Sequence, residues 1–156
     1  MAHRTKVVDR TTVIPSPPSA VFHAVMSPDT APLIDPGVRE WRPDAEPIGV
    51  GTRFTIRGRL GVVPIRGTSE AVRWEPPLLA EFRSVVTWPA QLTAQHRFEP
   101  RPDGGTNYTW SITFREASII SRPLVALTAR LFTRNLANQA DALTSYLGSV
   151  PPPSND

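Results

Sequence analysis

The chain has 156 residues, 40% of them hydrophobic, which predicts one globular domain over residues 1–150 and a disordered tail at 151–156. Its net charge of +3 comes from basic residues scattered singly along the sequence, a distribution that argues against a nucleic-acid partner. The absence of cysteine excludes disulfides and thiolate chemistry, while the lack of a long apolar run or a signal-like N-terminus predicts a cytoplasmic protein that is not an integral membrane protein.

The first part of the sequence predicts a strand, two short helices and two more strands. Residues 6–14 alternate in polarity and are rich in β-branched side chains, as is typical of a strand. Two prolines after Ser16 begin a short helix that directs Val21, Phe22 and Val25 inward. A second short helix covers about 29–34 and ends in a turn at Asp35, and the next strands are expected at 38–42 and 52–60.

The second part predicts four strands and one long helix. The strands are expected at 65–75, 79–87, 92–101 and 106–116, and the helix at 121–148. Apolar residues recur along this helix with the spacing of a helix buried on one side: Leu124, Leu127, Leu131, Leu136, Ala140, Leu143 and Leu147. One curved sheet closed by one terminal helix is the arrangement that follows, and we expect a cavity between them.

The hairpin turns predict which side chains face that helix, because directly opposed residues of an antiparallel pair share a face. A three-residue loop at 103–105 places Phe98 opposite Trp110 and His96 opposite Ile112. A loop at 88–90 places Phe82 opposite His96. The expected inner face therefore consists of Ala80, Phe82, Ser84, Val86, Leu92, Ala94, His96, Phe98, Tyr108, Trp110, Ile112 and Phe114.

The order of elements, together with five sequence segments, resembles the polyketide cyclase/dehydrase and lipid-transport superfamily, also called SRPBCC or START-like. The segments are 13–22, 35–39, 49–54, Glu75-Pro76-Pro77 and 104–110. The resemblance implies an α+β helix-grip fold, in which a seven-stranded antiparallel sheet wraps around a long C-terminal helix. It implies less about function, because the superfamily includes aromatase/cyclases, lipid carriers and members of other roles. Leu33 or Ile34 stands where the second short helix of the family often carries tryptophan.

His96 is the sharpest candidate for chemistry. Its predicted aromatic and aliphatic neighbours disfavour the charged imidazolium, which leaves a neutral base or hydrogen-bond donor. The alternative is a core histidine satisfied by one local partner.

Glu70 and Arg66 are the other candidate catalytic residues. If the Glu75-Pro-Pro loop has three residues, Glu70 opposes Phe82 and points into the cavity; if the loop has two, it opposes Arg83 in an exposed ion pair. The family resemblance implies that cavity arginines orient the carbonyl oxygens of a polyketide, a role open to Arg66, Arg73 and Arg83. A solvated outer face is the alternative for all three arginines. Arg83 could join Phe82 on the inner face only through a bulge.

The sequence is compatible with three functions. The first is binding of a small hydrophobic molecule, such as a lipid, polyketide or aromatic metabolite, at Phe82, Trp110, Tyr108, Ile112, Phe114, Trp74 and Phe54. The second is a cyclase or dehydratase. In it, neutral His96 removes a proton alpha to a carbonyl group, and Glu70 or Arg66 stabilises the resulting oxyanion. The third is a regulatory or interaction protein whose cavity is vestigial.

The remaining sequence features bear on metals, cofactors and protein or membrane partners. Three dispersed histidines predict no metal site, and no cofactor is expected because the sequence has no phosphate-binding loop. Asp35 either reaches the mouth of the cavity or only forms a turn. The apolar connections at 60–65 and 119–120 form a gate, an acyl-carrier or membrane-surface contact, or simple packing on the last helix. The protein is expected to be a monomer or a homodimer.

Overall fold

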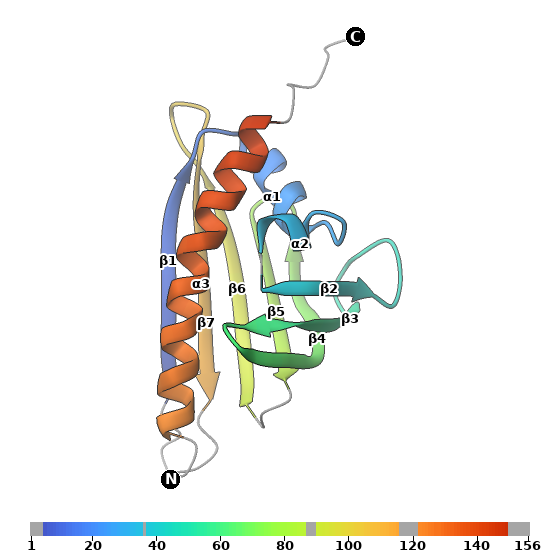
Figure 1. The fold of residues 1–156 in the computed structure, drawn as a ribbon. Helices are drawn as coiled ribbons and strands as arrows, with labels where there is room; N and C mark the ends of the chain where they lie inside the picture. Colours follow the sequence, from blue (N-terminus) through green and yellow to red (C-terminus); the bar gives the residue numbers. More distant parts are fainter. Residues whose placement is uncertain (1–4, 36, 87–89, 116–121, 150–156) are drawn as a thin grey trace.

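The computed structural model describes residues 5–35, 37–86, 90–115 and 122–149, which form one curved antiparallel sheet with a long helix on its inner side (Figure 1). The seven strands are ordered β1-β7-β6-β5-β4-β3-β2. Figure 1 shows the C-terminal helix running along β1 and β7, with the two short helices packed near its C-terminal end. The predicted α+β helix-grip fold is therefore confirmed.

The elements lie close to their predicted bounds. The strands are β1 Thr5–Ile14, β2 Val38–Pro43, β3 Arg53–Leu60, β4 Val63–Glu75, β5 Leu79–Val86, β6 Ala90–Pro100 and β7 Thr106–Arg115. The helices are α1 Pro18–Met26, α2 Ala31–Ile34 and α3 Arg122–Ser149. Most of the stretch 60–65, predicted as a connection, belongs to strands, because Gly61 and Val62 alone make the turn between β3 and β4. The segment at 119–120 and the tail at 151–156 lie outside the described residues.

Both predicted hairpin registers are wrong by two residues, although every predicted face is correct. His96 lies opposite Trp110 and Ala80, and Phe98 lies opposite Tyr108. In the β6–β7 hairpin the three-residue loop begins one position earlier than predicted, since the N–H of Arg101 donates to the carbonyl oxygen of Gly105 at 2.9 Å. A shift of two residues leaves the faces unchanged because side chains alternate with a period of two.

A bulge in β4 reverses the alternation that the sequence predicts. Ala71 pairs with Phe82 and Arg73 pairs with Glu81, so Val72 is an extra residue between two regular pairs. Before the bulge, odd-numbered residues such as Ser69 and Ala71 are buried, whereas Trp74 beyond it also packs on the core. Glu70 and Trp74 therefore lie on opposite faces, although simple parity places them together.

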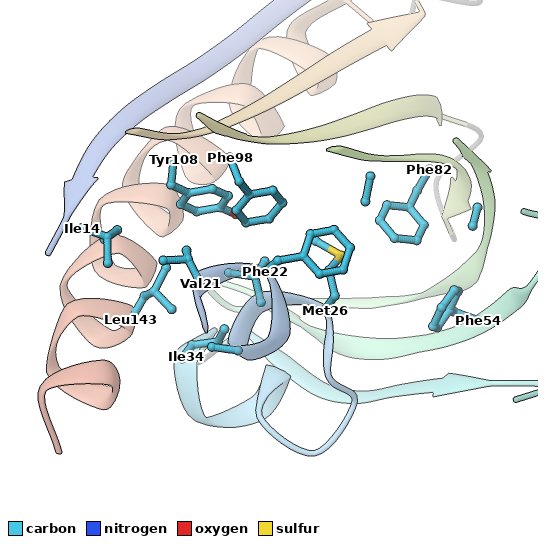
Figure 2. Packing of buried hydrophobic residues seen from close by; sticks show 14 residues of the cluster. Ile14, Val21, Phe22, Met26, Ile34, Phe54, Phe82, Phe98, Tyr108 and Leu143 are labelled. Carbon is cyan, nitrogen blue, oxygen red and sulfur yellow. The ribbon is translucent and has the colours of Figure 1, made fainter. Parts of the chain in front are cut away.

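The hydrophobic core fills the space between α1, the C-terminal half of α3 and the sheet. Figure 2 shows Ile14, Val21 and Leu143 together at one end of this core, and Phe82 and Phe54 at the other. A second cluster joins β6 and β7 to α3 and consists of Leu92, Ala94, Ile112, Phe114 and Ala129.

The predicted stripe on α3 is only partly buried. Leu136, Ala140 and Leu143 are buried, whereas Leu127 is 52% exposed. Within the described part of the chain, no helix is both long and apolar enough to cross a membrane.

We expect Gly58→Ala to lower the free energy of unfolding by about 1–3 kcal/mol, the usual cost of overpacking. A Cβ atom at position 58 would lie 2.0 Å from the carbonyl oxygen of Gly37, so the two backbones would have to separate. Urea denaturation would measure the loss. Gly49→Ala is the matched control, because a Cβ there meets nothing within 4 Å. Equal stability of the two variants would contradict the steric explanation.

Candidate functional site

A cavity of about 170 Å³ lies between the inner face of the sheet, α1, α2 and α3. Its wall is mainly apolar and aromatic: Val25, Met26, Ala31, Ile34, Val38, Trp41, Ile56, Ile65, Phe82, Val86, Leu92, Ala94, Trp110, Ile112 and Phe132. Seven polar residues also line it: Asp35, Arg59, Ser69, Ser84, His96, Asn135 and Gln139. An apolar cavity of about 150 Å³ is known to accept benzene, so this one has room for a single substituted ring.

His96 lies in the wall of this cavity and is uncharged. It is 8% exposed, and its ring stacks on Trp110 with centroids 5.2 Å apart. Burial lowers the pKa of His96 from 6.5 to about 3, because the charged imidazolium would lose its hydration. The imidazole is therefore neutral at physiological pH.

Tyr108 determines which nitrogen of His96 carries the proton. The Tyr108 hydroxyl lies 2.9 Å from Nδ1 of His96 and has no second hydrogen-bond partner within the described residues. Burial raises the pKa of Tyr108 well above its ordinary value, so the hydroxyl keeps its proton and needs an acceptor. Nδ1 is that acceptor, which leaves the proton of the neutral ring on Nε2. His96 thus presents an N–H donor to the cavity.

Asp35 is a buried carboxylate that joins α2 to α3. Its Oδ1 accepts the backbone N–H of Gly37 at 2.9 Å and the side-chain amide of Asn135 at 3.0 Å. Asp35 is 6% exposed, and this burial raises the pKa of its carboxyl group against the opposing effect of hydrogen bonds from Asn135, Gly37 and Val38. Both predicted alternatives for Asp35 hold, because the residue forms a turn with Gly37 and also lines the cavity.

Sequence reasoning missed Asn135 and Gln139 as polar residues of the cavity. They lie one turn apart on α3, beside the buried Leu136, Ala140 and Leu143 of the apolar stripe. Their position next to that stripe was the available signal. Nothing in the sequence indicates that Asn135 pairs with Asp35, which is 100 residues away.

Four of the predicted site residues line the cavity, and four others lie behind its wall. His96, Phe82, Trp110 and Ile112 contribute to the wall. The other four pack within the core: Tyr108 stacks on Phe98, Phe114 lies against Phe132, Trp74 contacts Phe22 and Phe82, and Phe54 stacks on Trp41. These four support the wall without forming it.

Glu70 and Arg66 do not reach the cavity. Glu70 lies opposite Arg83 on the outer face, with its carboxylate 3.9 Å from Nε of Arg53. Arg66 is exposed on the same face, because it lies four residues before Glu70 in the regular part of β4 that precedes the bulge. The placement of these two residues beside His96 is therefore wrong, and the alternative for Glu70, opposite Arg83 on the outer face, is the one observed.

Arg73 and Arg83 are also exposed, which agrees with the solvated outer face considered for them. Arg59, at the end of β3, is an arginine that does line the cavity.

The sequence profile of the family described as "Polyketide cyclase / dehydrase and lipid transport" matches residues 5–148. An uncharacterized protein of Mycobacterium tuberculosis is 33% identical over 106 residues, a match that covers 62% of this chain and 61% of that protein. The chain thus spans less than two thirds of the length of that relative.

Solved structures show the same fold at low sequence identity. The Zhui aromatase/cyclase of Streptomyces sp. R1128 superimposes with a TM-score of 0.78 at 14% identity, over 93% of this chain and 94% of that one. The major latex-like protein 151 of Panax ginseng gives a TM-score of 0.75 at 13% identity, over 94% and 99%. At such identities the likeness concerns the fold.

The buried His96 makes the stability of the protein depend on pH. Above pH 6.5 the ring is neutral in both the folded and the unfolded protein. Below pH 6.5 His96 binds a proton in the unfolded chain, whereas in the folded protein it stays neutral down to about pH 3. The free energy of unfolding should fall over this range by up to about 1.4 kcal/mol per pH unit, and His96→Gln should remove that slope. Denaturation of both proteins at several pH values measures the difference. A slope unchanged by His96→Gln, or removed equally by changing the exposed His23, would contradict it.

Asp35→Asn should stabilise the protein as the pH rises. Because the folded pKa of Asp35 is raised, its favourable contribution is present at low pH and is lost as the carboxyl group ionises. Asparagine retains an oxygen for Gly37 and Asn135 but carries no charge, so we expect a gain on the order of 1 kcal/mol once Asp35 is ionised. Melting temperatures between pH 4 and 8 test this, with the exposed Asp141→Asn as the charge-matched control. A loss of stability independent of pH would be the contrary result.

Proposed function

Because the chain belongs to the polyketide cyclase/dehydrase and lipid-transport family, we propose that it binds one small hydrophobic molecule in the cavity beneath α3. Members of this family bind hydrophobic ligands or act as cyclases. The observation that carries the proposal is the cavity itself, whose wall is formed largely by aliphatic and aromatic side chains. Transfer of apolar ligand surface from water to such a wall is favourable.

The size of the cavity favours an aromatic metabolite over the larger ligands. A volume of about 170 Å³ is below the roughly 300–1,000 Å³ typical of pockets for drug-sized molecules. An acyl chain or an extended polyketide exceeds this volume, whereas one substituted ring fits within it.

His96 would orient the ligand through its Nε2–H group. A carbonyl or other acceptor could take this hydrogen bond, which is stronger in an apolar wall than in water. Proton abstraction by His96 would instead require a lone pair on Nε2, and the hydrogen bond from Tyr108 leaves that lone pair on Nδ1. Together with the outward position of Glu70 and Arg66, this favours a binding protein over the cyclase or dehydratase alternative.

Toluene should bind saturably to the purified protein and raise its melting temperature with the logarithm of toluene concentration above the Kd. Ala94→Leu adds side-chain volume to the cavity wall and should weaken toluene binding by about tenfold or more, as a filled cavity predicts. Gln91→Leu is the control, because Gln91 is exposed on the outer face of the same strand. Isothermal titration calorimetry or NMR titration gives the affinities.

Absence of toluene binding to the wild-type protein would overturn the proposal. Equal binding by Ala94→Leu and the wild type would show that toluene binds elsewhere.

A further inference from the structure

We propose that Asp35 and Gln139 form a polar subsite for a hydroxyl group, so that the ligand class of the cavity is small hydroxylated aromatics rather than hydrocarbons. The inference rests on the proposed function, since it concerns the same cavity. It adds a chemical class and two specificity-determining residues.

The first half of the subsite is the second oxygen of Asp35. Gly37 and Asn135 both donate to Oδ1, which fixes the carboxylate between the end of α2 and the face of α3. The backbone N–H of Val38 also favours the ionised carboxyl group, but neither bond to Oδ1 uses Oδ2, which keeps a lone pair for a further donor. A buried carboxylate oxygen in a cavity wall is a strong acceptor, and it requires a donor that water or a ligand must supply.

The second half is the amide of Gln139. Gln139 is 5% exposed, lines the cavity and makes no hydrogen bond to any part of the chain that the structure describes. It lies four residues after Asn135, so the two side chains project from the same face of α3. Since Asn135 holds Asp35, Gln139 lies about one helical turn along α3 from the residue that binds the carboxylate.

A hydroxyl group satisfies both residues at once. It donates its proton to Oδ2 of Asp35 and accepts a hydrogen bond from the Nε2 amide group of Gln139. A hydrocarbon leaves both groups unpaired, a carboxylate ligand is repelled by Asp35, and an ammonium group would lose its hydration in a wall that is otherwise mainly apolar. A ring in the apolar part of the cavity with its hydroxyl toward α3 therefore matches the wall best.

The test compares phenol with toluene, two rings of similar size that differ in one hydroxyl group. Calorimetric or NMR titration at neutral pH should give wild-type protein an affinity for phenol about tenfold or more above that for toluene, as expected for hydrogen bonds to buried polar groups. Asp35→Asn replaces the acceptor Oδ2 with an amide donor, and Gln139→Leu removes the amide. Each should reduce the preference to about threefold or less while toluene binding persists.

Asn138→Leu is the matched control, because Asn138 directly precedes Gln139 on α3 but is exposed. This variant should prefer phenol over toluene as strongly as the wild type does. Should either cavity variant fail to fold, the side-chain amide resonances of Gln139 in the wild type serve instead, shifting with phenol but not with toluene.

The outcomes separate this proposal from the proposed function. Equal binding of phenol and toluene by the wild type would overturn the subsite and leave hydrophobic binding intact. A preference for phenol that survives both Asp35→Asn and Gln139→Leu would also overturn it. Failure of both compounds to bind would overturn the proposed function and the subsite together.

Discussion

The structure depends on one geometric constraint: a wide curved sheet has a single long helix to cover its inner face. Seven strands at about 4.8 Å spacing extend across roughly 29 Å, whereas a helix with its side chains is about 10 Å wide. The helix α3 covers the β1–β7 side, and α1 and α2 cover part of the remainder. The uncovered part of the inner face is the cavity, which is therefore a consequence of the architecture.

The polar groups at this cavity show how the chain limits the cost of burying them. Ser69 and Ser84 satisfy each other across β4 and β5 at 2.8 Å, and Tyr108 satisfies one nitrogen of His96. Within the described residues, Gln139 and the buried Nε1 of Trp110 have no hydrogen-bond partner, and the bonds from Gly37 and Asn135 use only one oxygen of Asp35. Buried polar groups are normally paired, so those that are not deserve a chemical explanation. A ligand that completes their hydrogen bonds supplies one, and the stability lost in its absence is then linked to binding.

The fold of this family does not determine which polar residues line the cavity. Structures at 13% and 14% identity share the sheet and the long helix, because many different side chains can fill the same apolar positions. The polar residues of the cavity are a separate matter. In this chain Arg66, Arg73 and Arg83, the arginines that the family resemblance offered for the cavity, lie outward, whereas Asp35 and Arg59 line the cavity. Membership of the family therefore says little about the ligand.

The sequence alone determined the order of elements and the inner face of β5, β6 and β7. It also determined the apolar surroundings that keep His96 uncharged. It could do so because side-chain alternation has a period of two and survives an error of two residues in register. Only the tertiary structure revealed features that depend on a break in strand alternation or on a contact between residues far apart in the sequence. The bulge at Val72 turned Glu70 outward, and periodicity contains no sign of it. The pairing of Asp35 with Asn135 arises only when α3 packs against α2, so local sequence could not reveal the polar side of the cavity.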